Sequence, residues 1–179
     1  MIEADLHDFF SVRCDEGSRL ASTLKGRLER ARVREIVAHH LPAPPARVAD
    51  IGGGTGAHAE WLQAQGHRVE LIDPVRQHVD AAKRAGIRAR VGDARELPWR
   101  DDRFDLALLA GPLYHLTASG DRKVALYETA RVVKPGGTVC VLAFNRHANL
   151  LGATLANQLL QRRGRTACCA EGRWLPVWR

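Results

Sequence analysis

The chain has 179 residues, of which 45% are hydrophobic and 26% are charged. This size and balance are typical of one folded globular domain and exclude an intrinsically disordered chain. The formal net charge of +7 does not by itself indicate nucleic-acid binding, because the last 29 residues hold five arginines and a single glutamate. Basic residues also do not alternate with aromatic ones in a nucleic-acid-binding pattern. We therefore expect no nucleic-acid partner.

The sequence contains no sign of secretion, membrane insertion or metal binding. Its first residues are acidic and lack an apolar core, and no stretch approaches the roughly 18 apolar residues of a membrane span. No two of the four cysteines form a Cys-x-x-Cys pair, which favours a reduced, intracellular protein. The histidines have no acid or cysteine at ligand spacing, so we expect no metal site. A cytoplasmic location with no membrane span is the expectation.

Stretches with helical and strand periodicity alternate along most of the chain. The first expected helix covers about residues 19–41, and a proline-rich linker at 42–45 separates it from the first strand. The expected strands are 47–51, 68–72, 88–91, 104–110 and 138–144, and the expected helices between them are 58–65, 76–85 and 121–133. This alternation predicts an α/β fold, a Rossmann-like doubly wound and mostly parallel sheet with helices on both faces.

The most informative stretch is Val-Ala-Asp-Ile-Gly-Gly-Gly-Thr-Gly at residues 48–56. Glycine at Gly52, Gly54 and Gly56 permits positive φ and lets a ligand approach the backbone closely. A strand, a glycine turn and a helix N-terminus together form a cradle for a nucleotide-like ligand. Glycine turns also close ordinary strand–helix units, so this stretch alone leaves both interpretations open.

Aspartates lie at or just after three of the expected strand ends. Asp73 follows the glycine turn by about 20 residues, where a carboxylate can accept from ribose hydroxyls or cap the next helix. Asp93 can accept from an exocyclic amine while the Ala94 amide donates to a ring, or it can simply stabilise a turn. Asp50 can orient the glycine loop, meet a ligand ammonium group, or remain a buried acid bonded to backbone amides. Because the carboxyl ends of parallel strands meet at one edge of the sheet, the set indicates a nucleotide site.

The fourth strand runs directly into a Gly-Pro turn that is followed by Tyr114 and His115. Substrate is expected to enter after this strand, and the pKa range of histidine suits a general base. The two side chains are therefore candidate catalytic residues. They can equally serve only to shape the pocket.

Taken together, these stretches resemble the class I S-adenosylmethionine-dependent methyltransferases. The likeness is greatest to the group that includes the menaquinone and ubiquinone C-methyltransferases. It covers about residues 19–150, and its motifs are 48–56, Leu-Ile-Asp at 71–73, Gly-Asp-Ala at 92–94 with Leu-Pro at 97–98, Phe-Asp at 104–105, and Arg-Val-Val-Lys-Pro-Gly-Gly at 131–137. It implies S-adenosyl-L-methionine as cofactor and methyl transfer as the activity, with a small molecule as the expected acceptor. The sequence leaves open whether oxygen, nitrogen or carbon is methylated.

The resemblance also implies a role for each motif residue. The methionine part of the cofactor would lie against the glycine loop, the ribose against Asp73, and the adenine against Asp93 and Ala94. Two residues at the end of strand four would line the methyl-donor pocket. The complete set of implied cofactor contacts is Asp50, Gly52, Gly54, Thr55, Gly56, Asp73, Asp93, Ala94, Ala110 and Gly111, with Tyr114 and His115 as the candidate catalytic pair.

We expect an N-terminal helical lid at 1–45, a cofactor-binding core at 46–160 and an irregular basic tail at 161–179. The tail shows no convincing pair of strands, whereas class I methyltransferases usually add a two-stranded antiparallel edge after strand five. A missing edge hairpin would leave strand five exposed and could favour oligomers. A truncated, catalytically weak cofactor-binding module is therefore an alternative. An NAD-dependent oxidoreductase is a second one, since residues 52–57 also fit a dinucleotide fingerprint, although the chain has no Tyr-x-x-x-Lys motif.

Overall fold

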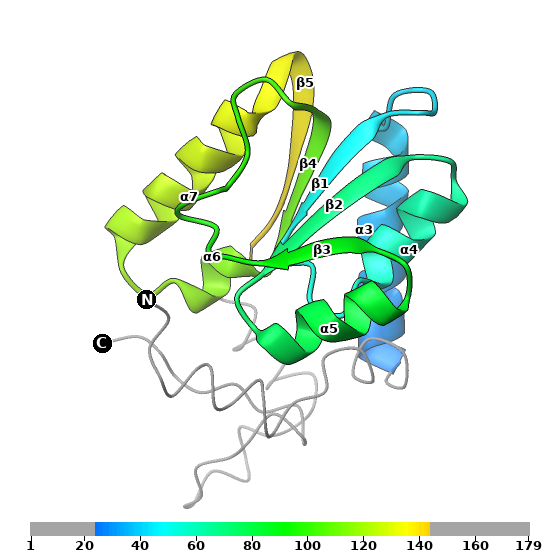
Figure 1. Ribbon diagram of the computed structural model, residues 1–179, viewed down its shortest axis with the longest axis horizontal. Coiled ribbons are helices and arrows are strands. Elements are labelled where there is room, and N and C mark those ends of the chain that lie inside the picture. Colours follow the sequence, from blue (N-terminus) through cyan, green and yellow to red (C-terminus); the bar gives the residue numbers. More distant parts are fainter. Residues whose placement is uncertain (1–23, 144–179) are drawn as a thin grey trace, which may run out of the picture. The chain divides into compact units, whose positions relative to one another are not determined.

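The computed structural model describes residues 24–143, in which helices and strands follow the predicted order (Figure 1). The five strands are β1 (Arg47–Ile51), β2 (Arg68–Asp73), β3 (Arg88–Val91), β4 (Phe104–Ala110) and β5 (Val133–Leu142). The helices are α3 (Leu24–His40), α4 (Ala57–Ala64), α5 (Arg76–Arg84), α6 (Pro112–His115) and α7 (Ser119–Val132). Residues 19–23 of the first expected helix, the end of the fifth expected strand and the expected tail lie outside the described range.

All five strands are parallel and lie in the order β3-β2-β1-β4-β5. The chain therefore moves outward from β1 through β2 to β3, and then returns to the other side of β1 for β4 and β5. This reversal confirms the doubly wound fold expected from the alternating pattern. In such sheets ligands bind beyond the carboxyl ends of the strands where the order reverses, which here is between β1 and β4.

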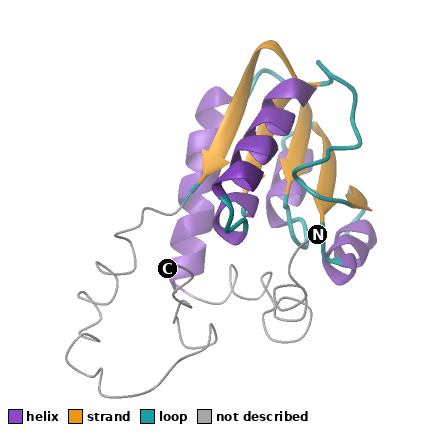
Figure 2. Cartoon of the chain, turned by 90° about the vertical axis from the view of Figure 1, so that its left-hand side faces the viewer, coloured by secondary structure: helices purple, strands orange, loops and turns teal. Residues whose placement is uncertain are grey.

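Each face of the sheet is covered by its own apolar layer. Figures 1 and 2 show α7 on one side of the strands and α3 on the other. The layer under α3 and α4 contains Val33, Val37, Val48, Leu62, Leu71, Leu106 and Leu108. The layer on the α7 side contains Ile51, Ile72, Trp99, Phe104, Leu109, Ala125 and Val132. Because both faces are buried, the central strands read as nearly continuous apolar runs, and this is why the sequence located them well.

Two local features differ from the expectation. The last strand begins at Val133 rather than at residue 138, because Val133 pairs with Phe104 before a register shift brings Thr138 opposite Leu106. A short helix, α6, replaces the expected open turn after β4 and has Pro112 in its first turn. A helix of four residues is too short to produce a periodic pattern in the sequence.

Candidate functional site

The glycine loop connects β1 to α4 and starts with a hydrogen bond from the Gly52 amide to the Ile72 carbonyl at 2.7 Å. A Cβ on Gly52 would lie 2.6 Å from Pro112 Cδ, and one on Gly56 would lie 2.2 Å from Ile87 Cδ1. A Cβ on Gly54, in contrast, would meet no atom within 4 Å, although its φ of +57° favours glycine. Packing against the proline ring thus requires glycine at position 52, and at Gly56 a φ of +96° adds to the contact with the buried Ile87 side chain. Gly54 is the glycine of this loop whose surroundings are open for a ligand.

Asp73 is the last residue of β2 and is 95% buried. Its carboxylate accepts hydrogen bonds from backbone amides in the loop after β1 and in the segment after β2. The Gly54 amide donates to Oδ2 at 2.9 Å, and the Val75 amide donates to Oδ1 at 2.9 Å. His78 Nδ1 lies 3.1 Å from Oδ1. The structure therefore joins Asp73 directly to the glycine loop. The N-cap of α5 is Val75, which has no side-chain capping bond, so Asp73 does not take the helix-capping position that the sequence allowed.

Asp50 lies next to the last residue of β1 and is fully buried. A Cβ on Gly53 would come within 2.6 Å of its carboxylate, so the glycine loop lies directly against it. The pKa of Asp50 is raised to about 7, chiefly by burial and then by the charge of Asp73, with an opposing effect of the Ala59 backbone amide. Within residues 24–143, neither carboxylate oxygen has a partner in hydrogen-bonding geometry. The alternative that the sequence left open, a buried acid bonded to backbone amides, therefore has one candidate donor, the Ala59 amide that lowers the pKa.

Asp93 follows β3 and is held by Arg95, a contact that the sequence did not indicate. The guanidinium contacts both carboxylate oxygens, with Nε 3.0 Å from Oδ1 and Nη2 2.6 Å from Oδ2, and it also reaches Asp121 on α7 at 2.6 Å. Burial raises the pKa of Asp93, but the hydrogen bonds from Arg95 outweigh it and hold the pKa below its ordinary value. Ala94 beside it is buried. The Gly92 amide donates to the Asp73 carbonyl at 3.2 Å, which joins this loop to β2.

The end of β4 lies against the glycine loop. Gly111 has a φ of +147°, and a Cβ there would lie 3.3 Å from the Gly52 carbonyl oxygen and 3.8 Å from Tyr114 Oη. Tyr114 and His115 follow on α6, with ring centroids 4.6 Å apart in an edge-to-face arrangement. Both side chains are half-buried. The structure thus brings the candidate catalytic pair and the glycine loop to the same end of the sheet.

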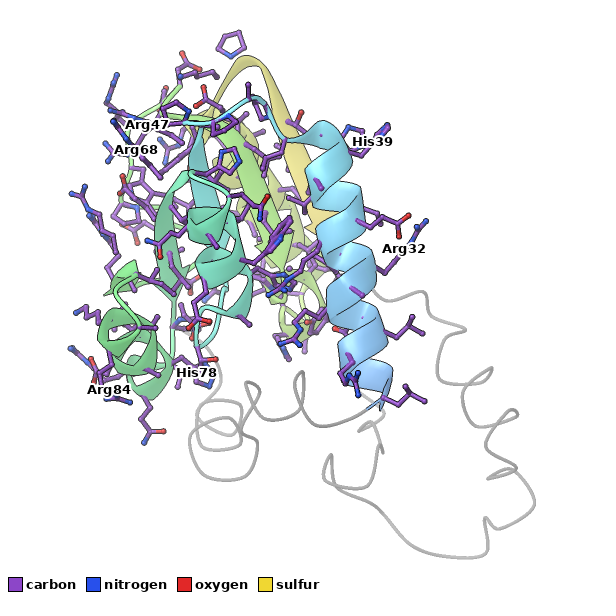
Figure 3. The ribbon with its side chains drawn as sticks, turned by 90° about the vertical axis from the view of Figure 1, so that its right-hand side faces the viewer. Arg32, His39, Arg47, Arg68, His78 and Arg84 are labelled. Carbon is purple, nitrogen blue, oxygen red and sulfur yellow. The ribbon has the colours of Figure 1, made fainter. Side chains whose placement is uncertain are left out.

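The helix α3 reaches the start of α4 through Arg34, whose Nη2 donates to the Ala57 carbonyl at 2.7 Å. Beside this contact, His58 is buried and its pKa is lowered to about 4 by burial, then by the charges of Arg34 and Arg30. Other α3 side chains, such as Arg32 and His39, point away from the sheet (Figure 3). Neither Arg34 nor His58 was singled out in the sequence, because one reads as a surface charge and the other as an ordinary helical residue.

Within residues 24–143, no group of three or more His, Cys, Asp or Glu side chains is arranged to hold a metal ion. In the same range, no helix has the length and apolar character needed to cross a membrane.

The sequence model of the family described as "Methyltransferase domain" matches residues 49–141. The match starts in β1 and ends in β5, so it includes all five strands and the connections described above, and it covers more than half of the chain. The chain belongs to this methyltransferase family. The family expected from the sequence motifs is thereby confirmed.

Two curated relatives are similar over the same region. A human protein named "Probable tRNA methyltransferase 9B" is 34% identical over 123 residues, which are 65% of this chain and 26% of the relative. A "Demethylmenaquinone methyltransferase" of Corynebacterium kroppenstedtii is 31% identical over 121 residues, which are 68% of this chain and 52% of the relative. This chain thus spans between about a quarter and a half of the length of these relatives.

Solved structures support the fold. The PH0226 protein from Pyrococcus horikoshii superimposes with a TM-score of 0.65 at 19% identity, covering 83% of this chain and 70% of that protein. The [4+2]-cyclase SpnF superimposes with a TM-score of 0.53 at 28% identity, covering 62% of this chain and 43% of that protein. Since a cyclase is among the structural neighbours, the fold alone does not fix the chemistry.

Proposed function

We propose that this chain binds S-adenosyl-L-methionine and transfers its methyl group to a small-molecule acceptor. The observation that carries the proposal is the family match over residues 49–141. That range contains the open Gly54 backbone, the unpaired carboxylate of Asp50 and the carboxylate of Asp73, all at the carboxyl ends of adjacent strands.

The chemistry of these residues fits this cofactor. A buried carboxylate without partners is costly, and a ligand ammonium group near the glycine loop would offset the charge of Asp50. Asp73 can accept from a ribose hydroxyl beside the Gly54 amide. Asp93 and the Ala94 amide would hold the adenine, although the Asp93 carboxylate already contacts Arg95. Thr55 and Ala110 complete the proposed set of contacts.

When bound, the cofactor supplies a methyl group on a positively charged sulfur, which is electrophilic without covalent help from the protein. The remaining contribution of the chain is to orient the acceptor and to exclude water, which can supply much of the acceleration. A Cβ on Gly111 would lie 3.3 Å from the Gly52 carbonyl oxygen, so the end of β4 packs directly against the glycine loop. His115 and Tyr114 are the proposed general bases, taking the proton from a hydroxyl or an acidic carbon of the acceptor.

The acceptor class has a second candidate, because one curated relative carries the name of a tRNA methyltransferase. We favour a small molecule, since Tyr114 and His115 are half-buried on α6 and the described strand ends carry acidic rather than basic side chains. Incubation with labelled cofactor and either total tRNA or a quinol mixture separates the two classes. We also propose that the protein is cytoplasmic, because none of its cysteines form a Cys-x-x-Cys pair.

The first experiment is calorimetric titration of the protein with S-adenosylmethionine, S-adenosylhomocysteine and NAD in parallel. Binding of both sulfur nucleotides with micromolar Kd, equivalent to about −8 kcal/mol, and no response to NAD is the expected result. NAD binding alone would replace the proposal with an oxidoreductase. A folded protein that binds none of the three would refute cofactor binding by this chain.

Asp73→Ala should weaken S-adenosylhomocysteine binding by about tenfold to a hundredfold, because it removes the carboxylate that would accept hydrogen bonds from the ribose. The control is Asp80→Ala, which removes an aspartate on the helix that follows, α5. Unchanged affinity in a folded Asp73→Ala protein would refute the ribose assignment.

A further inference from the structure

The guanidinium of Arg95 joins two segments that are far apart in the sequence. Its Nη2 lies 2.6 Å from Oδ2 of Asp93 in the β3–β4 loop, residues 92–103. Its Nη1 lies 2.6 Å from Oδ2 of Asp121, in the first turn of α7. The side chain of Arg95 is only 19% exposed. Solvent and salt screen a partly buried ion pair less than an exposed one, so this bridge should contribute to local stability.

The first turn of α7 depends on contacts from outside the helix. Its N-cap is Ala118, which forms no side-chain cap, and Gly120 is the second residue of the helix. Both features weaken a helix start, because an uncapped end leaves backbone amides without partners and glycine has a low helix propensity. The bond from the Arg122 amide to the Ala118 carbonyl is 3.3 Å long. The ion pair between Asp121 and Arg95 ties this turn to the β3–β4 loop.

The same turn of α7 holds the end of α6. Nη1 of Arg122 donates to the carbonyls of Leu116 at 2.7 Å and Thr117 at 2.6 Å, directly after α6. With four residues, α6 is too short to be stable as an isolated helix. Its position therefore depends on its two ends. Pro112 packs against Gly52 of the glycine loop at the start, and Arg122 holds the other end.

We propose that Arg95 is a positioning residue for Tyr114 and His115, the proposed bases on α6. By pairing with Asp121 it holds the first turn of α7, and through Arg122 that turn holds α6. One guanidinium thus keeps α6 in a fixed arrangement with the β3–β4 loop, to which the adenine is assigned. This inference rests on the proposed function, because only there do the two side chains act as bases.

The first test measures how readily α6 opens in the protein without ligand, by amide hydrogen exchange followed by NMR. The amides of Tyr114 and Leu116 are suitable probes, since they donate to backbone carbonyls at 3.3 Å and 3.0 Å. In Arg95→Leu and in Asp121→Ala, both amides should exchange about fivefold faster than in the wild type, because each change removes the bridge to α7.

Matched variants separate this effect from other causes. The double variant should exchange no faster at α6 than either single variant, because both changes break the same link. Arg95→Leu keeps the carboxylate that favours a helix N-terminus, so an effect shared with Asp121→Ala does not come from the helix dipole alone. Asp121→Glu keeps the charge and should restore most of the protection. The control is Arg100→Leu, which removes an exposed arginine of the same loop and should behave like the wild type.

A reference amide in the sheet reports on overall stability. Ala49 lies on β1 and is paired with both β2 and β4. Its exchange should stay at the wild-type rate in every variant, because the bridge acts on α6 and α7 rather than on the sheet.

The second test adds S-adenosylhomocysteine to the wild type and to Asp121→Ala, which leaves the contact between Arg95 and Asp93 in place. The two affinities should agree within about twofold. In the wild type, saturation with this ligand should slow exchange both in the β3–β4 loop and on α6. In Asp121→Ala, the slowing in the loop should persist and the slowing on α6 should largely disappear, because the link between them is broken.

Several results would overturn the inference. Unchanged exchange on α6 in both single variants would show that Arg95 does not hold this helix, and an equal acceleration at Ala49 would show a loss of overall stability instead. Equal slowing of α6 by the ligand in wild type and Asp121→Ala would exclude the route through α7. If Arg95→Leu does not fold, identical exchange in Asp121→Ala and Asp121→Glu would refute it.

The failure of the proposed function would give a different result. A wild-type protein that does not bind S-adenosylhomocysteine would refute cofactor binding. The exchange of α6 without ligand would still decide whether Arg95 holds that helix.

Discussion

Replacement of Asp50 by asparagine should make the protein more stable at alkaline pH. The folded-state pKa of Asp50 is about 7, against an ordinary value of 3.8. Between these values the unfolded chain ionises Asp50 while the folded chain keeps the proton, so the unfolded state binds fewer protons and stability falls as the pH rises. The folded and unfolded pKa values differ by about three, and each pKa unit corresponds to about 1.36 kcal/mol. The free energy of unfolding of the wild type should therefore fall by at most about 4 kcal/mol, and the fall should be complete just above pH 7. An asparagine at this position cannot ionise, so Asp50→Asn should lack this loss.

The assay is urea unfolding of wild type and Asp50→Asn at pH 5, 6, 7 and 8. The free energy of unfolding of the variant, relative to wild type, should rise across this range and then level off. Taking the difference removes the titration of all other groups, including His58. Asp80→Asn, which changes an aspartate on α5, is the control and should follow the wild-type curve. A difference that stays constant from pH 5 to 8 would refute the placement of a buried, unpaired carboxylate beneath the glycine loop.

Three further substitutions test other parts of the site. His58 should give the wild type the opposite pH dependence, because its folded pKa of about 4 lies below the ordinary value of 6.5. The wild type should lose up to about 3 kcal/mol of unfolding free energy as the pH falls from 6.5 to 4. Unfolding measured across this pH range should show that His58→Gln lacks that loss. Gly56→Ala should cost about 2–4 kcal/mol in thermal or urea unfolding, because its Cβ would strike Ile87. Gly86→Ala is its control, since φ is also positive there but no atom lies within 4 Å of the new Cβ, and equal costs would contradict the packing explanation. His115→Ala should lower turnover about 10²-fold or more with cofactor affinity unchanged, and full activity would leave the residue a packing role.

The sequence predicted the parallel core well because burial on both faces of the sheet produces continuous apolar runs. The bounds of β1, β3 and β4 agree with the expected 47–51, 88–91 and 104–110. Agreement is poorer where the backbone is irregular. The register shift at the start of β5 depends on pairing with β4, and a pairing between distant segments leaves no local pattern in the sequence.

For the site, the sequence located the strand ends but not the contacts between them. The positions of Asp50, Asp73 and Asp93 follow from strand boundaries, and their roles toward a ligand stay predictions. Arg95 reads as a surface charge in the sequence, although it reaches both Asp93 and α7. His78 carried a readable signal, since it is a polar residue on the inward, otherwise apolar face of α5.

Asp73 connects three separate loops. Its side chain accepts from Gly54 in the first loop and from Val75 in the second, while its carbonyl accepts from Gly92 in the third. Loops that share one anchor cannot open one at a time without breaking bonds in common, so local opening of this edge should be cooperative. A ligand that meets all three loops would then find them already in place, and little of its binding energy would be spent on ordering the chain.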